Sequence, residues 1–238
     1  MKSKAIVLRT VKYTDEAFIA HLLTEQCGCV AMLVRISRSR RTQVRHTLFQ
    51  PMAVLAVEWV EHARASLQRP KSVQVVQIFS SLPYDPHKSA IALFLADFLY
   101  HAVRSEPDTT LLFAYVERSL EWLDACRTGF ANFHLVFLFR LTYFLGFMPN
   151  LHEARAGDWF DLRSSCFVHE RPLHPDFLSP SDAALLPKFM RMRYENMRFF
   201  RFSGDDRSRL LRHINDYYRL HLPDFPELKS LAVLGDLF

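Results

Sequence analysis

Residues 30–59 read VAMLVRISRSRRTQVRHTLFQPMAVLAVEW, and the fold prediction starts from this stretch. Apolar runs rich in β-branched residues, at 30–36 and 52–60, are typical of β-strands. Between them lies a polar segment without an acidic residue. The arginines of this stretch are Arg35, Arg38, Arg40, Arg41 and Arg45. The pattern predicts two strands that display a cationic loop.

This arginine-rich loop must face either solvent or an anion, because a buried guanidinium would lose its hydration with nothing to replace it. Phosphate suits arginine, since the planar fork of the side chain can hold two oxygens at once. Short neutral donors such as Ser37, Thr42 and Gln43 are also common partners of phosphate backbones. Two interpretations stay open: a solvated charged loop and a phosphate-binding loop.

Further strands are predicted on both sides of the loop. The five predicted strands are residues 5–13, 18–24, 29–36, 52–60 and 72–79. Short antiparallel strands in this number, within about eighty residues, suit a small closed barrel such as an OB-fold. Residues 1–80 are therefore expected to form an OB-fold nucleic-acid-binding domain.

Two prolines, Pro83 and Pro86, mark a change from strand to helical periodicity. The predicted helices are residues 88–104, 109–127, 130–147, 181–190 and 205–221. Between the third and fourth, near 150–180, the chain has an irregular insertion that resembles a packed loop or a short hairpin. The predicted class is α+β, with a five-stranded antiparallel barrel at 1–80 and an all-α domain at 81–238.

The helix predicted at 130–147 is apolar on almost every side, which fits either a buried central helix or a membrane span. Arg140 lies in its middle, with Asn132, His134 and Thr142 also inside the segment. No comparable apolar segment is present to shield these polar groups within a bilayer. The buried central helix is the favoured interpretation.

Positive charge is concentrated in the first third of the chain. Residues 1–80 hold 12 basic and 5 acidic side chains, whereas the remainder holds 18 basic and 20 acidic ones. This asymmetry indicates a module that binds a polyanion, joined to a nearly neutral one. The candidate DNA contacts are Lys4, Arg9, Lys12, Arg35, Arg38, Arg40, Arg41 and Arg45.

Aromatic residues near this charge are candidates for stacking against bases, although burial in the barrel explains them equally well. They are Tyr13, His46, Phe49 and Trp59. A possible second basic surface alternates with aromatic residues in the helical half, at Arg191, Arg193, Arg198 and Arg201. Packing of an amphipathic helix, with arginine stems along its flanks, explains that pattern as well.

Catalytic motifs are missing from the sequence. It contains no GxSxG, HExxH, GxGxxG or Walker-type phosphate loop. The nearest approach to a metal cluster, at His169, Glu170, His174 and Asp176, lacks ligand spacing and fits solvated loop residues better. Cys27 and Cys29 are too close together for a structural zinc knuckle. The chain is therefore predicted not to be an enzyme and to need no metal or cofactor.

Location is predicted from the start of the chain and from its cysteines. Residues 5–8 are too short an apolar run for a secretion signal, and four scattered cysteines do not indicate a disulfide framework. A cytoplasmic protein is expected.

Four separate segments resemble the bacterial recombination mediator family RecO. They are AIVLRTVKYTDEAFIAHLLTEQCG at 5–28, LFQPMAVLAVEW at 48–59, FLFRLTYFLGFMPNL at 137–151 and YYRLHLPDFPELKSLAVLGDLF at 217–238. They occur in family order and span nearly the whole chain. The resemblance implies an OB-fold followed by a helical domain that binds single- and double-stranded DNA, anneals complementary strands and associates with the nucleoid.

The resemblance also implies partners: the C-terminal tail of the single-strand-binding protein, RecR, and the RecA recombinase that such mediators help to load.

One feature departs from the family, because many members have a four-cysteine zinc site after the central helix, whereas residues 151–178 contain only Cys166. Apolar packing by Trp159, Phe160 and Phe167 is expected in its place.

The alternative function is a protein-interaction adaptor whose basic loop binds an acidic protein partner.

Overall fold

The computed structural model describes residues 1–36, 46–62, 65–104, 109–228 and 230–235 of the chain. Two compact units form, Met1–Ala125 and Cys126–Phe238. The predicted α+β class is confirmed, since an antiparallel five-stranded sheet precedes the helices. The division predicted near residue 80 stays a prediction, because compact packing alone does not define a domain.

The first unit is built on one curved sheet, whose strands have the order β3-β2-β1-β4-β5. They are β1 (Lys2–Thr14), β2 (Ala17–Thr24), β3 (Cys29–Arg35), β4 (Val54–Trp59) and β5 (Pro70–Val75). The backbone of Gln68, just before β5, connects the two edges: Leu33 N–H donates to its carbonyl at 2.8 Å, and its own N–H donates to Ala31 O at 2.9 Å. The sheet thus closes like an OB-fold barrel.

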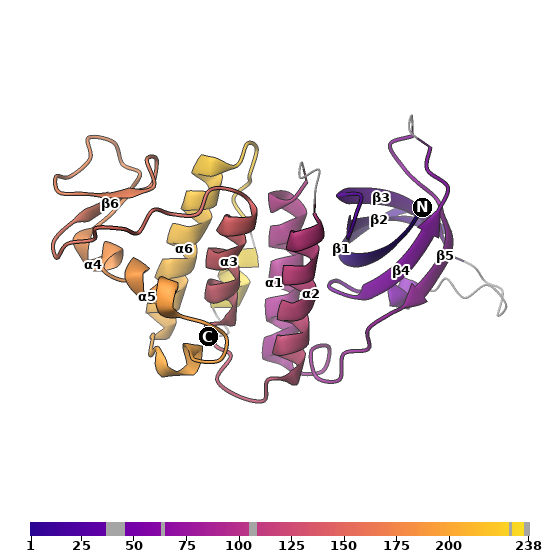
Figure 1. The fold of residues 1–238 in the computed structure, drawn as a ribbon. Coiled ribbons are helices and arrows are strands. Elements are labelled where there is room, and N and C mark those ends of the chain that lie inside the picture. The colour runs from indigo at the N-terminus through magenta and orange to yellow at the C-terminus, as the bar shows by residue number, and fades with distance from the viewer. Residues whose placement is uncertain (37–45, 63–64, 105–108, 229, 236–238) are drawn as a thin grey trace. The chain divides into compact units, whose positions relative to one another are not determined.

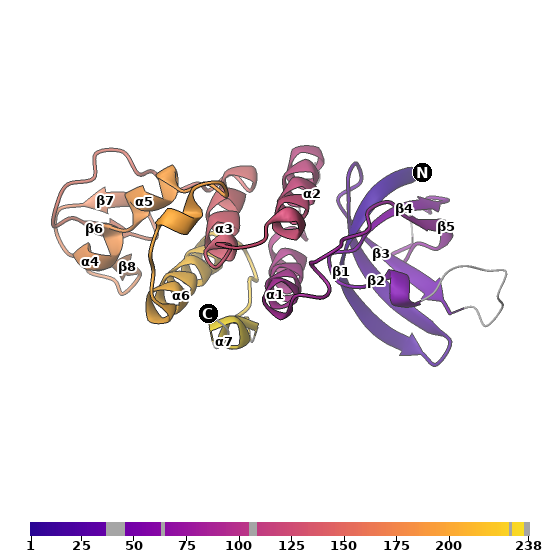
Figure 2. The ribbon, with the colours of Figure 1, turned by 90° about the horizontal axis from the view of Figure 1, so that it is seen from below.

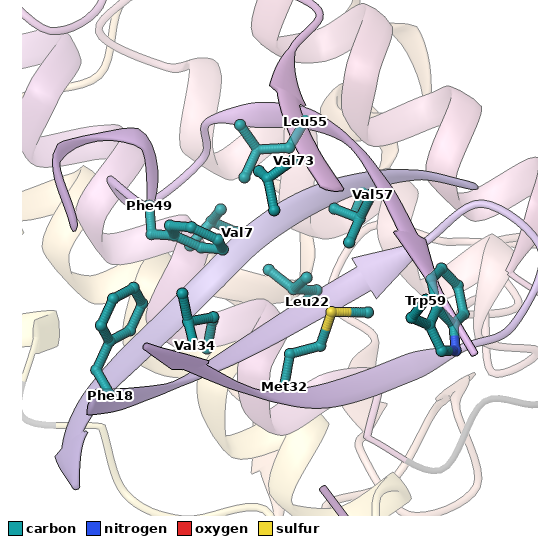
Figure 3. Close-up of a cluster of buried hydrophobic side chains, with 12 residues drawn as sticks. Val7, Phe18, Leu22, Met32, Val34, Phe49, Leu55, Val57, Trp59 and Val73 are labelled. Carbon is teal, nitrogen blue, oxygen red and sulfur yellow. The ribbon is translucent and has the colours of Figure 1, made fainter. Parts of the chain in front are cut away.

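Alternate side chains of the strands point into the barrel, as their period of two requires. Figure 3 shows Val7, Leu22, Met32 and Val57 converging on this interior, where each is at most 1% exposed. The opposite face of β1 is also buried, since Ile6 and Leu8 are 0% and 3% exposed. Both faces of β1 are buried over Ala5–Leu8, so this part of the strand lies at the centre of the unit, whereas residues 9–14 are mostly exposed.

Two strands are shorter than the sequence pattern predicted. β4 begins at Val54 rather than at residue 52, because Met52 has the left-handed φ of 65° and turns the chain before the ladder starts. β5 then ends at Val75 rather than at residue 79, since its last paired residue lies opposite Leu55. Val54 is the one β4 residue beyond that pair; its carbonyl accepts from the backbone N–H of Val76 at 3.0 Å, and the strand stops there.

Two helices complete the first unit, α1 (Pro86–Ala102) and α2 (Thr110–Ala125), and α1 packs on β1 (Figure 1). Asp85 caps α1 by accepting hydrogen bonds from the backbone N–H groups of His87 and Lys88, and Pro86 occupies the first helical position. The buried residues of both helices recur at helical spacing, as Ile91, Leu95 and Phe98 do on α1 and Leu112, Val116 and Leu120 on α2.

Asp124, at the end of α2, holds the segment that connects the barrel to α1. Its carboxylate accepts hydrogen bonds from the backbone N–H groups of Ser80, Ser81 and Leu82 at 2.9, 2.8 and 2.7 Å. Burial alone would raise the pKa of Asp124, but these hydrogen bonds lower it to about 2. The buried Lys88 ammonium donates to Ser81 Oγ at 2.6 Å and to Asp124 O at 3.0 Å.

The second unit contains α3 (Phe133–Phe144), α5 (Leu186–Arg191) and α6 (Gly204–His221), with the short helices α4 (Pro180–Ala183), η2 (Met197–Phe199) and α7 (Ser230–Gly235). Fully buried Tyr218 on α6 donates from its hydroxyl to Leu138 O of α3 at 2.8 Å. Ser203 begins α6 with a capping box to Asp206. No helix in the described ranges has the length and apolar character needed to cross a membrane.

Residues near 150–180 form a small sheet of the order β7-β6-β8 (Figure 2). Its strands are β6 (Trp159–Asp161), β7 (Cys166–Val168) and β8 (Phe177–Leu178). The hairpin interpretation is confirmed for β6 and β7, and β8 adds an unpredicted third strand. Phe160 is 1% exposed and packs edge-to-face against Phe167, with ring centroids 5.1 Å apart. Trp159 packs in the same way against Phe177, with centroids 5.0 Å apart. The expected packing of Phe160 and Phe167 is present, and Trp159 packs against Phe177.

The Asp124 clamp predicts a pH-dependent contribution to stability. Asp124→Asn should lower the free energy of unfolding by about 2 kcal/mol at pH 7, because an amide accepts with one oxygen only and turns its NH₂ group toward the linker N–H groups. Since the folded pKa lies below the ordinary 3.8, the contribution is complete above about pH 4 and disappears as the pH falls toward 2.

Urea denaturation at several pH values checks this prediction, with Asp15→Asn as the control because its carboxylate is 91% exposed. The difference between wild type and Asp124→Asn should shrink below pH 4. A difference that stays constant down to pH 2 would contradict a role for the carboxylate charge.

Candidate nucleic-acid interface

The barrel fixes both ends of the arginine-rich loop. On one side the backbone N–H of Ile36 donates to Glu16 O at 2.8 Å. On the other side, η1 (His46–Leu48) leads into Phe49. This residue is 1% exposed and packs against Phe18, with ring centroids 5.1 Å apart. Arg35 is exposed where the loop leaves β3. Arg38, Arg40, Arg41 and Arg45 lie outside the described residues, so their roles stay predictions.

The predicted contacts on β1 have different surroundings. Lys4 Nζ forms an ion pair with Glu117 of α2 at 2.8 Å, and the hydrogen bond to Glu117 raises the pKa of Lys4. Lys12 pairs with Asp15 at 2.6 Å, but both side chains are largely exposed at 76% and 91%, where an ion pair is weak. Lys12 is therefore more available to an external anion than Lys4, whose carboxylate partner is 17% exposed.

Arg9 belongs to a cluster of basic side chains, with His21 and Arg104, that was not predicted from the sequence. Its guanidinium carbon lies 5.3 Å from the ring centroid of Tyr100 on α1, and the same ring contacts His21 at 4.9 Å. Burial, together with the charges of Arg9 and Arg104, lowers the pKa of His21. Seventy-nine residues separate His21 from Tyr100, so only the packing of α1 on the sheet brings them together.

Three of the four candidate stacking residues can be assigned. Phe49 and Trp59 are 1% and 3% exposed in the barrel core, so the burial interpretation is the correct one for both. Tyr13 is 59% exposed near the end of β1 and stays available for stacking. The side chain of His46 lies outside the described residues.

The possible second basic surface follows α5. Arg191, Arg193, Arg198 and Arg201 are all exposed. The Arg198 guanidinium lies 4.8 Å from the ring centroid of Phe199, which is itself 69% exposed. The alternative interpretation, packing of an amphipathic helix, does not describe this segment, since Arg191 ends α5 and beyond it only the single turn η2 is helical before residue 203.

The polar group of the irregular insertion separates into distinct pairs. His169 Nδ1 lies 2.7 Å from Asp158, His174 Nε2 lies 3.4 Å from Asp161, and Arg163 Nη2 lies 2.6 Å from Asp176. Within the part of the chain that the structure describes, no three His, Cys, Asp or Glu side chains gather as a metal site.

The cysteines do not fit the zinc site that the family resemblance raises. Cys166, the one cysteine of the insertion, lies beside Ser164 Oγ at 3.3 Å. Cys27 and Cys29 flank Gly28, whose left-handed φ of 66° makes the tight turn from β2 to β3. In that turn the hydroxyl of Thr24 donates to Gly28 O at 2.7 Å, and the Cys29 thiol donates to Val103 O at 3.4 Å.

Family models match both halves of the chain. Residues 1–79 match the model described as "Recombination protein O N terminal", and residues 83–232 match "Recombination protein O C terminal". The two matches meet at the linker that Asp124 holds. The matches together cover nearly the whole chain, so the resemblance seen in the four segments extends along its length.

Named relatives agree with the family models over their full length. The chain is 49% identical to the DNA repair protein RecO of Bacteroides fragilis, over 100% of this chain and 98% of the relative. Identity with the protein of the same name from Phocaeicola vulgatus is 48%, with the same coverage. With that of Flavobacterium psychrophilum it is 30%, over 100% of this chain and 99% of the relative.

The different surroundings of Lys4 and Lys12 lead to a test. Lys12→Met should weaken affinity for an oligonucleotide about two- to threefold at fixed low salt, since a largely free charge is lost. Lys4→Met should leave that affinity unchanged and lower the melting temperature instead, because Lys4 is already paired with Glu117. Fluorescence anisotropy and thermal melts measure the two effects. Equal loss of affinity in both variants, with unchanged melting, would show that the Lys4 pair opens to the ligand.

Proposed function

The chain belongs to the RecO family of DNA repair proteins, and from this premise we propose that it binds DNA and anneals complementary single strands without catalysing a covalent reaction. The observation that carries the proposal is that a chain of this family concentrates its net positive charge in the barrel, at residues 1–80. Annealing needs that charge, because two phosphate backbones repel each other until cations neutralise them.

The proposed mechanism is electrostatic. Arg35 and the loop arginines Arg38, Arg40, Arg41 and Arg45 hold one backbone, and displaced counterions supply much of the binding free energy. Arg9 and Lys12 extend the same positive surface along β1 in this proposal. Lys4 contributes less than the sequence predicted, since its charge is shared with Glu117 at 2.8 Å. Contacts of this type position a strand without reading its bases, which suits a protein that anneals any complementary pair.

The proposed partners come from the family. They are single- and double-stranded DNA, the C-terminal tail of the single-strand-binding protein, and RecR, with assistance to RecA loading as the outcome. An acidic tail is a suitable partner for a chain whose net charge is positive. A cytoplasmic, nucleoid-associated location follows from the same proposal.

Annealing of two complementary labelled oligonucleotides tests the function. The comparison is between wild type and a variant with Arg38, Arg40, Arg41 and Arg45 changed to alanine, at low and moderate salt. We expect at least a tenfold loss of both binding and annealing rate, roughly what four lost phosphate contacts imply. Circular dichroism provides the control that the variant still unfolds cooperatively.

Two results would contradict parts of the proposal. Unchanged annealing in the variant would move the DNA contacts away from the loop. No binding or annealing by the wild type would favour the adaptor function, in which the loop meets an acidic protein.

A further inference from the structure

The side chains of Asn132, which precedes α3, and of half-buried Arg140 in α3 hold the backbone of residues 191–202, which has little regular structure of its own. The side-chain amide of Asn132, 5% exposed, donates to Met197 O at 3.2 Å and to Phe200 O at 2.8 Å. The Arg140 guanidinium donates to Met192 O at 3.2 Å. These donors replace the hydrogen bonds that a helix would supply, so the irregular conformation is held in place.

Packing holds the same segment from two further sides. Met192 and Met197 are 0% exposed, and Tyr194 stacks on Phe133 of α3 with ring centroids 4.8 Å apart. Gly129, with φ of 79°, allows close approach, since a Cβ at this position would lie 2.9 Å from Arg198 Cβ. The segment is therefore preorganised before any ligand arrives.

What this scaffold presents to solvent is positive and aromatic. Phe199 is 69% exposed, which is unusual for phenylalanine, and its ring has the Arg198 guanidinium 4.8 Å from its centroid. Arg191, Arg193 and Arg201 are exposed as well. Among the described residues, none of these four arginines forms an ion pair with a carboxylate, and Glu195 is the one acidic residue between them.

We infer that Arg191–Arg201 is a second binding surface for single-stranded nucleic acid, on which a base stacks against Phe199 while the arginines hold the neighbouring phosphates. The inference rests on the proposed function and assigns a place to a second strand, separate from the loop of the barrel. Exposed aromatic rings beside arginines bind single strands without sequence preference, because every base has a flat face.

The chemistry favours a nucleic acid over an acidic peptide. A peptide that inserts an aromatic side chain needs an apolar cavity, and a cavity that admits benzene measures about 150 Å³. The apolar cavity between α3, α5 and α6 measures about 40 Å³ and is lined by Phe139, Phe189 and Tyr217, without Phe199. The exposed ring of Phe199 offers a flat contact, which suits a base.

Three variants of the full chain separate stacking from charge. Phe199→Ala removes the ring and keeps the arginines, whereas Arg191→Ala/Arg193→Ala/Arg201→Ala removes charge and keeps the ring. Arg212→Ala is the matched control, since Arg212 is an exposed arginine on α6 of the same unit. The probes are an oligothymidylate with one 2-aminopurine, whose fluorescence falls on stacking, and heparin, a polyanion without bases.

Phe199→Ala should weaken oligonucleotide affinity about tenfold and abolish the fluorescence change, with heparin affinity unchanged. Phe199→Trp keeps an aromatic ring, so it should retain the oligonucleotide affinity and the fluorescence change of the wild type. That result would show that Phe199→Ala loses both because the ring is missing and not because the protein unfolds. The triple variant should weaken both oligonucleotide and heparin binding, and Arg212→Ala should weaken neither by more than about twofold.

The inference is overturned if wild type binds the oligonucleotide and Phe199→Ala binds it equally well, which would leave the proposed function intact. It is overturned in favour of a peptide site if Phe199→Ala loses affinity only for an acidic peptide ending in phenylalanine. Absence of any oligonucleotide binding by wild type overturns the proposed function itself.

Discussion

The high cost of burying a polar group without a partner organises both units of this chain. In the first unit, Gln68 pairs the backbone at the edges of the sheet, and Asp124 takes the N–H groups of the linker after the barrel. In the second, Asn132 and Arg140 take the carbonyls of a segment that has no helix to pair them. Charged side chains without such a partner cannot be buried, and the exposed arginines therefore lie at the surface.

This constraint explains why the helix predicted at 130–147, which is α3 in the structure, could be interpreted from the sequence either as a buried helix or as a membrane span. The polar residues within 130–147 argued against a membrane span, but their positive role was not visible. Asn132 and Arg140 act on residues more than fifty positions later, at Met192, Met197 and Phe200. His134 lies fully buried, and burial, followed by the charge of Arg207, lowers its pKa to about 3. The polar groups of α3 therefore serve the interior of the protein.

Local periodicity was sufficient to predict the five strands, the main helices and their buried faces, because those features depend on neighbouring residues. Where the sequence failed, the cause was a distant partner. β5 stops at Val75 because β4 begins at Val54, and Lys4 is paired with a carboxylate that is 113 residues away. The basic cluster of Arg9 forms only when α1 packs on the sheet. For residues 191–202 an amphipathic helix was one of two interpretations, and the side chains of Asn132 and Arg140 hold a mostly irregular conformation instead.

The two proposed contact surfaces, on two compact units, would suit a protein that brings strands together, since each would neutralise phosphates of a different strand. The segment that carries the second surface is held by Asn132 and Arg140, so it takes shape without a ligand. Preorganised cations of this kind lose less entropy on binding than flexible ones.

The most direct measurement is the affinity of the wild-type protein for one single-stranded oligonucleotide across a range of salt concentrations. Phosphate neutralisation predicts that the logarithm of the association constant falls linearly with the logarithm of salt, by about 0.7 for each phosphate contacted, with a total slope of about −3 or steeper. A slope near zero, or no measurable affinity at low salt, would contradict the account that phosphate contacts are the basis of function.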